Sequence, residues 1–156
     1  MKAEVINAKA IRFTDTDNEE HIVLVKGVEE LIIERHDKSL VYFIGLPNWP
    51  CLIEIDRDTY NMFFESIEKY LGDGTEKIRM VTEQDISKKI KFKDLGSWKQ
   101  AVFPEDIYGL SIEQYEGSLE YFVNISNKGY GTEVDFKTFN ILLAALKAVA
   151  NAKESK

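Results

Sequence analysis

One stretch of this chain occurs twice. Residues 9–72 align with residues 88–151 without a gap when the sequence is shifted by 79 positions, and 17 of the 64 aligned positions are identical. Chance would match roughly one position in sixteen, so the repeat predicts a duplicated supersecondary unit. Each copy of 64 residues is marginal as an independent domain, so we expect the two copies to share a core or to pair closely.

The hydrophobic pattern predicts the same order of elements in both copies. In the first copy, period-two alternation predicts five short strands at residues 10–15, 21–26, 30–36, 39–46 and 51–56. Apolar residues at helical spacing then predict a helix over 57–71, with Asp56 as its N-cap and Gly72 as its end. The predicted fold class is therefore α+β, a tandem duplication of about five antiparallel strands followed by one C-terminal helix, packed with pseudo-two-fold symmetry.

The repeat also sets the predicted domain boundaries. We expect a first repeat over 1–72, a polar connector over 73–87, a second repeat over 88–151 and a frayed tail over 152–156. The sheet face opposite the predicted core face also carries apolar side chains, namely those of Val41 and Phe43 in the first copy and Phe122 in the second. Because aromatic residues are usually buried, we expect the sister copy or a partner to cover that face, with internal packing favoured.

Charge is divided unevenly between the copies. The chain carries a net charge of −7; the first copy has 13 acidic and 7 basic residues, whereas the second has 8 of each. This difference predicts different surface roles for the two copies and disfavours general affinity for a polyanion. The start of the chain lacks the apolar core of a signal peptide, and no run approaches the length of a membrane-spanning helix, so we expect a cytoplasmic protein without membrane contacts.

Residues suited to nucleophilic catalysis are few. His21, His36 and Cys51 do not recur in the second copy, and motifs for phosphate binding, hydrolysis or zinc proteolysis are absent from the sequence. We interpret Cys51 as a core residue and both histidines as surface residues, and we predict neither an enzyme nor a cofactor.

Several acidic residues recur, and each has a structural interpretation. Asp15 recurs as Asp94, which is typical of a shared turn. Glu54 and Asp56, together with their counterparts Glu133 and Asp135, have a spacing that could hold a metal ion. Because aspartate is a common helix N-cap, we predict caps rather than a metal site.

A rigid loop in the acidic copy is the first candidate binding site. Two prolines flank Trp49 and lower the entropy cost of presenting its indole ring to a partner. With Glu29, Glu30 and Asp37, Trp49 is predicted to form a surface for a protein partner, for which a basic surface would be complementary. The alternative is that Trp49 folds back over the helix of its own copy.

A lysine-rich strand in the second copy is the other candidate. Alternation places Lys89, Lys91 and Lys93 on one face of a strand, and Trp98 follows. Together with Phe122, these residues offer the charges and aromatic rings with which proteins bind single-stranded nucleic acid. Lysines also protect the edges of sheets against aggregation, and that is their commoner use.

The order of strand, tight turn, aromatic strand, loop, strand and capped helix, repeated in tandem, resembles the layout of PUR-repeat and Whirly proteins. The resemblance covers both copies and implies a paired arrangement that binds single-stranded nucleic acid. Those families have four strands in each unit, whereas five are predicted here.

The residues favour a non-catalytic protein-binding module, such as an inhibitor, immunity or regulatory protein, that acts through an acidic surface and a rigid tryptophan loop. The alternative is a protein that binds single-stranded DNA or RNA. A small-molecule pocket between the copies and a homodimer are further arrangements that the sequence allows.

Overall fold

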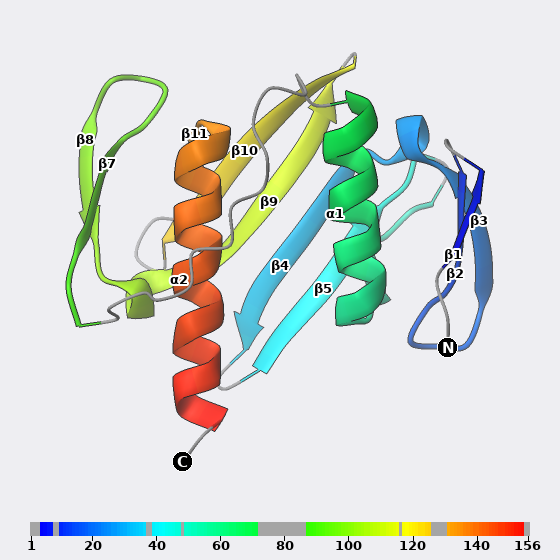
Figure 1. Ribbon diagram of the computed structural model, residues 1–156, viewed down its shortest axis with the longest axis horizontal. Helices are drawn as coiled ribbons and strands as arrows, with labels where there is room; N and C mark the ends of the chain where they lie inside the picture. Colours follow the sequence, from blue (N-terminus) through cyan, green and yellow to red (C-terminus); the bar gives the residue numbers. More distant parts are fainter. Residues whose placement is uncertain are drawn as a thin grey trace. The chain divides into compact units, whose positions relative to one another are not determined.

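A computed structural model describes residues 4–7, 10–36, 39–47, 49–71, 87–115, 117–125 and 131–154. The described residues form a mixed α+β fold with antiparallel strand pairs and two helices, one of them C-terminal (Figure 1). Neither helix is long and apolar enough to span a membrane over the described residues.

The first half of the chain contains six strands, a short 3-10 helix and an α-helix. These elements are β1 (Glu4–Asn7), β2 (Ala10–Thr14), β3 (Glu20–Leu24), η1 (Val25–Gly27), β4 (Glu30–His36), β5 (Ser39–Gly45), β6 (Ile53–Ile55) and α1 (Arg57–Leu71). The five predicted strands correspond to β2–β6, and the predicted bounds of the helix are confirmed. The strand predicted to end at Lys26 ends at Leu24, where the 3-10 helix η1 follows, and β1 was not among the five predicted strands.

The second half contains five strands, another 3-10 helix and the C-terminal helix. These elements are β7 (Ile90–Lys93), β8 (Lys99–Val102), η2 (Pro104–Asp106), β9 (Ile107–Tyr115), β10 (Ser118–Ile125), β11 (Thr132–Val134) and α2 (Phe136–Glu154). Gly117, between β9 and β10, has a φ of 83°, a left-handed conformation that glycine adopts without strain. The predicted connector lies largely outside the described residues, as does Gly72.

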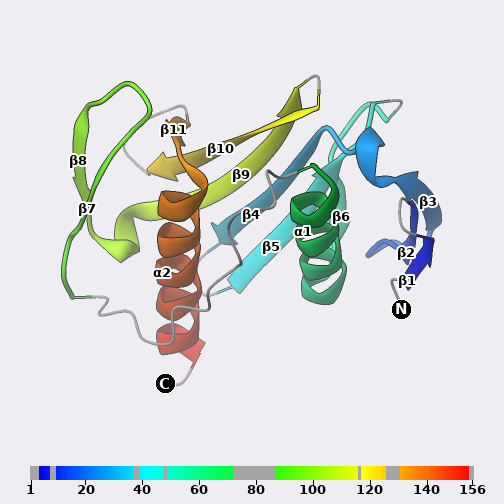
Figure 2. The ribbon, with the colours of Figure 1, turned by 45° about the horizontal axis from the view of Figure 1, so that its top comes forward.

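The strands form three sheets. One sheet has the order β1-β2-β3, a second pairs β7 with β8, and a six-stranded sheet has the order β11-β10-β9-β4-β5-β6 (Figure 2). The six-stranded sheet contains strands from both halves of the chain. This arrangement is set by pairing between strands that lie far apart in the chain. Local sequence patterns do not show which distant strands will pair.

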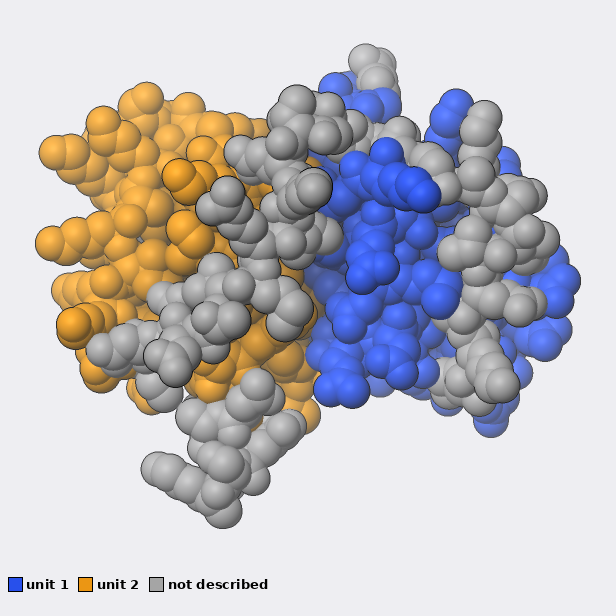
Figure 3. Space-filling model, in the orientation of Figure 1, with its two compact units in different colours: residues 1–32, 41–77, 112–119 blue, residues 33–40, 78–111, 120–156 orange. Residues whose placement is uncertain are grey.

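The chain divides into two compact units that do not follow the sequence halves. One unit contains residues 1–32, 41–77 and 112–119, and the other contains residues 33–40, 78–111 and 120–156 (Figure 3). We call them unit 1 and unit 2. Each unit therefore includes strand ends that come from the other half of the sequence.

Each unit has its own apolar core beneath one helix. In unit 1, Phe63 of α1 meets Phe13 of β2 with ring centroids 5.2 Å apart. In unit 2, Phe139 of α2 lies against Tyr121 of β10 at 5.2 Å. The rings of these residues are buried, so burial of aromatic residues contributes strongly to both cores.

Both helices begin with the predicted aspartate caps. The backbone N–H of Thr59 donates to Oδ1 of Asp56 over 2.8 Å, and the N–H of Thr138 donates to Oδ1 of Asp135 over 2.7 Å. Each bond satisfies an N–H group that has no partner within the helix. Both aspartates therefore have a structural role.

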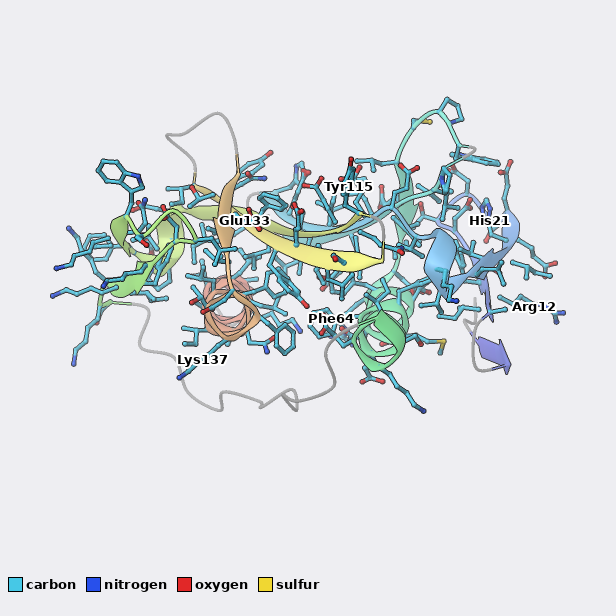
Figure 4. The ribbon with its side chains drawn as sticks, turned by 90° about the horizontal axis from the view of Figure 1, so that it is seen from above. Arg12, His21, Phe64, Tyr115, Glu133 and Lys137 are labelled. Carbon is cyan, nitrogen blue, oxygen red and sulfur yellow. The ribbon has the colours of Figure 1, made fainter. Side chains whose placement is uncertain are left out.

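The second face of the sheet is partly open in unit 1. Phe64 of α1 and Tyr115 of β9 lie on opposite sides of the sheet (Figure 4); Phe64 is buried, whereas Tyr115 is 67% exposed. Val41 and Phe43 are half-buried and Glu113 is exposed. We expected this face of the sheet to be buried by internal packing, but these residues are only partly buried or are exposed.

Candidate functional site

The turn between β2 and β3 is organised by Asp15. Its Oδ1 accepts hydrogen bonds from the backbone N–H groups of Asp17 and Glu19, and its Oδ2 lies 2.7 Å from Nε2 of His21. Burial alone would raise the pKa of Asp15, but the hydrogen bonds from His21, Glu19 and Asp17 outweigh it and lower the pKa. The buried carboxylate therefore stays charged and holds the turn.

His21 connects this turn to the tryptophan loop. Its imidazole ring stacks on Phe13 at 5.0 Å, and the indole ring of Trp49 lies edge-on to it at 5.3 Å. The His21 side chain is only 9% exposed, so its prediction as a surface residue is wrong. Trp49 remains 44% exposed, and its indole ring contacts His21 of β3.

A hollow of about 210 Å³ lies beside Trp49 in unit 1. Residues 49–52 of the loop form one side, Gly45 and Leu46 at the end of β5 another, and Glu29 and Glu30 complete it. The structure thus brings together three of the four residues predicted for the partner surface, while Asp37 lies outside the described residues. We call this site the Trp49 hollow.

The Trp49 hollow has an acidic wall. Burial raises the pKa of Glu30, and the negative charges of Glu113 and Glu29 raise it further. A Cβ atom at position 45 would lie 2.7 Å from Cγ of Glu30, so Gly45 is the residue that leaves room for this side chain. A cation from a ligand would relieve the repulsion among these carboxylates.

Cys51 and His36, which were considered as possible catalytic residues, are both exposed. Cys51 lies at the rim of the Trp49 hollow, so the prediction that it is a core residue is wrong. It follows a proline-bounded turn and precedes β6, which begins two residues later and only then enters the core. His36 is exposed as predicted, with Nε2 3.1 Å from Oε1 of Glu34.

The turn between β7 and β8 in unit 2 repeats this arrangement around Asp94. Its Oδ1 accepts a hydrogen bond from the backbone N–H of Trp98 over 2.9 Å, and its Oδ2 accepts one from Nε2 of Gln100 over 3.0 Å. Ser97 has a φ of 67°, and Asn18 in the first turn has a φ of 68°. The recurrence of Asp15 as Asp94 is therefore explained by a shared turn, as predicted.

Glu54 and Glu133 tie these turns to the six-stranded sheet. The backbone carbonyl of Glu54 accepts a hydrogen bond from the N–H of Thr16, and that of Glu133 accepts one from the N–H of Leu95. Among the described residues, the one group with metal-ligand spacing is Asp15, Glu19 and His21, whose donor atoms lie within 4.8 Å of one another. The hydrogen bonds of Asp15 already explain this group without a metal.

The outer face of the β7–β8 hairpin is basic. Lys91 and Lys93 are exposed, while Ile90 and Phe92 alternate with them in partly buried positions, as predicted. Lys93 lies directly opposite Lys99 of β8. Like charges directly opposite each other on a sheet repel, so this lysine pair destabilises the hairpin rather than holding it together.

Two aromatic residues accompany these lysines. Nζ of Lys89 lies 5.3 Å from the ring centroid of Phe103, which is itself partly exposed. Trp98 is 73% exposed at the tip of the hairpin. Phe122 lies elsewhere, half-buried on β10 opposite Glu133 of β11, so the structure does not add it to the basic hairpin face.

A second hollow, which was not predicted from the sequence, lies beside Trp98. It has a volume of about 570 Å³, and its lining includes Leu95, Trp98, Gln100, Thr132 and Glu133. These residues come from the β7–β8 turn, from the start of β8 and from β11, which lies about 35 positions further along the chain. The proximity depends on the bond between the Leu95 N–H and the Glu133 carbonyl, which no local pattern reveals.

Comparisons of the chain with protein-family models, with curated proteins and with solved structures find no match.

Proposed function

We propose that this chain is a non-catalytic protein-binding module, of the inhibitor, immunity or regulatory kind, that binds a basic partner through the Trp49 hollow. The observation that supports it best is the meeting of Glu29, Glu30 and the half-exposed Trp49 around one hollow. An aromatic ring beside carboxylates that repel one another is a combination that a cationic side chain on a partner recognises.

The Trp49 hollow could attract a cationic side chain by charge and also give it an apolar surface to contact. An arginine or lysine side chain that enters it would lie near Glu30, whose ionisation is disfavoured by burial and by Glu113 and Glu29. The cation would stabilise the ionised form, so binding should release a proton and strengthen as the pH rises through the raised pKa of Glu30. Trp49 would supply the apolar contact area typical of a binding hot spot.

A random peptide library displayed on phage tests this proposal, because it presents basic, acidic and neutral sequences to the protein at the same time. Selection on the wild-type protein should enrich peptides with arginine or lysine, and these peptides should bind the Trp49→Ala and Glu30→Gln variants at least about tenfold more weakly. Leu95→Ala is a matched control, because it removes another exposed apolar side chain in the other unit. Selected peptides that bind all three variants equally well would overturn the proposal.

We also propose that the chain is a tandem duplication with pseudo-two-fold symmetry. The bounds of the elements support this: η1 and η2, β5 and β10, β6 and β11, and α1 and α2 each begin 79 positions apart. The Asp15 and Asp94 turns and the two aspartate caps have the same separation.

Reciprocal hydrogen bonds give further support. Arg35 at the end of β4 donates to the backbone carbonyls of Ile107 and Glu105. Its sequence counterpart Gln114 at the end of β9 donates to the carbonyls of Val28 and Lys26. Donor and acceptors are in each case offset by the same 79 positions, as a two-fold relation requires.

Single-stranded DNA or RNA is a second candidate ligand, and the basic hairpin supports it. The hairpin over residues 87–103 contains five lysines and one acidic residue in a chain of net charge −7. Its outer face carries Lys91, Lys93 and Lys99 next to the exposed Trp98 at the tip. Lysines for phosphates and a flat ring for a base are the usual components of such a site.

Fluorescence anisotropy of labelled oligothymidine at two salt concentrations tests this candidate. We expect binding that weakens with salt and that is lost in a Lys91→Gln, Lys93→Gln, Lys99→Gln variant. A variant with arginine at the same three positions is the matched control and should keep binding. Equal affinity of the glutamine variant, or no binding at low salt, would exclude the hairpin as the nucleic-acid site.

A further inference from the structure

The outer face of β3 in unit 1 carries two large apolar side chains in solvent. β3 lies at one edge of the β1-β2-β3 sheet (Figure 1). Its side chains alternate, so Val23 is buried, whereas Ile22 is 64% exposed and Leu24 is 63% exposed. Two such side chains side by side on one strand form an apolar patch that nothing within the described residues covers.

The backbone of the same two residues also points away from the sheet. The N–H of Asp15 donates to the carbonyl of Glu19 over 2.9 Å, in the register that pairs β2 with β3. Hydrogen-bonded pairs alternate along an antiparallel ladder, so the odd-numbered residues of β3 bond to β2. The N–H and carbonyl groups of Ile22 and Leu24 therefore lie along the outer edge, with which no strand of the described residues pairs.

This edge lacks the usual protection against strand addition. Natural sheets protect their edges with lysine, proline or a β-bulge. β3 contains neither lysine nor proline, and its pairing with β2 runs from Glu20 to Leu24 without a bulge. An apolar edge of this kind can accept a further strand.

The sequence along this edge is complementary to itself. Every second residue from 20 to 26 gives an acid, two apolar residues and a base, namely Glu20, Ile22, Leu24 and Lys26. Both charged residues are exposed, and Lys26 lies in η1 directly after β3. When a second copy runs antiparallel about Val23, Ile22 lies opposite Leu24 of that copy and Glu20 lies opposite its Lys26.

From the open edge and this pattern we infer that two copies of the chain associate by antiparallel pairing of β3 about a two-fold axis. The backbone groups of Ile22 and Leu24 would bond across the axis and join the two β1-β2-β3 sheets into one. The apolar pair would lie at the centre, with a Glu20–Lys26 ion pair at each end. Because the interface is short, we expect a weak dimer that forms as the protein concentration rises.

Sedimentation velocity over a concentration series from about 10 µM to about 1 mM tests the inference. The wild-type protein should change from monomer to dimer within this range. A variant with both Ile22→Thr and Leu24→Thr should associate at least about tenfold more weakly, because it loses the apolar contact. Threonine is well accepted in strands, and circular dichroism confirms that this variant is folded.

Charge reversal tests the register and the identity of the occupant. Glu20→Lys and Lys26→Glu each place like charges opposite one another at both ends of the interface, so each should weaken self-association about tenfold. An equimolar mixture of the two variants should recover the dimer, because every charge then faces an opposite one. Lys91→Glu on β7 is the matched control, because it changes the net charge as Lys26→Glu does at an exposed position in unit 2, and it should leave association unchanged.

Three results would overturn the inference. These are a wild-type protein that stays monomeric up to about 1 mM, threonine and charge variants that associate as the wild type does, and a mixture of the charge variants that dimerises no better than either alone. The first result would leave the edge to a strand of a different protein. The Trp49 hollow has no lining residue from β3, so the proposed protein-binding function has its own separate test.

Discussion

Replacement of Tyr60 by phenylalanine should stabilise this protein. Tyr60 lies on α1 with 1% of its surface exposed, and its hydroxyl has no hydrogen-bond partner among the described residues. Its ring packs against Tyr42 at 5.1 Å and Phe64 at 6.3 Å, so the aromatic contacts do not depend on the oxygen atom. A buried hydroxyl that gives up water without gaining a partner costs about 1–3 kcal/mol.

The size of the effect follows from that cost. Tyr60→Phe removes the unpaired oxygen and leaves only a small void, so we expect the free energy of unfolding to rise by about 1 kcal/mol. For a chain of this length the midpoint of thermal unfolding should rise by about 2–4 °C. Burial, together with Tyr42 and Glu68, raises the pKa of Tyr60, so the phenol stays neutral and the gain should not depend on pH between about 6 and 9.

Phe139 provides the matched control. It lies 79 positions after Tyr60, on α2, is fully buried, and packs against Tyr121 much as Tyr60 packs against Tyr42. Phe139→Tyr should therefore destabilise the protein by about the amount that Tyr60→Phe gains, or more if the added oxygen overpacks the core.

Urea denaturation followed by circular dichroism measures both variants. The midpoint should move while the slope of the free energy against urea stays the same, because the surface exposed on unfolding is nearly unchanged. A loss of stability in Tyr60→Phe would refute the reasoning, because it would mean that the hydroxyl is satisfied in the folded protein.

Three further predictions concern charged groups. Asp15→Ala should destabilise the protein by about 1–3 kcal/mol at pH 7, as measured by urea denaturation. Because the pKa of Asp15 is lowered in the folded state, the difference in stability from the wild type should shrink as the pH falls below about 4. A difference that stays constant with pH would contradict this prediction. Glu30→Gln should raise the urea midpoint at pH 7 but not at pH 4, because the raised pKa means that the folded state disfavours the ionised form; an equal gain at both pH values would refute this. Asp56→Ala and Asp135→Ala should each lower the free energy of unfolding by about 0.5–2 kcal/mol, and Asp→Asn at the same positions, which keeps the cap, should largely preserve it.

Some site residues could be found from sequence, and others could not. Trp49 could be singled out from the sequence because the two prolines that flank it are a local feature, whereas its 44% exposure is known only from the structure. Its packing on His21, and the Asp15 hydrogen bond that orders His21, depend on the folding of the β2–β3 turn. The hollow beside Trp98 could not be found, because its lining joins a turn to a strand about 35 positions away.

The sequence by itself determined the order of the five strands and one α-helix in each copy, the bounds of α1 and the aspartate caps of both helices, because hydrophobic periodicity and capping act over a few neighbouring residues. Only the tertiary structure decided that β4 and β9 are neighbours in one six-stranded sheet, that Cys51 is exposed, and that Glu29 and Glu30 line one hollow with Trp49. The physical reason is that strand pairing satisfies backbone hydrogen bonds between distant segments, and the burial of each loop follows from that pairing.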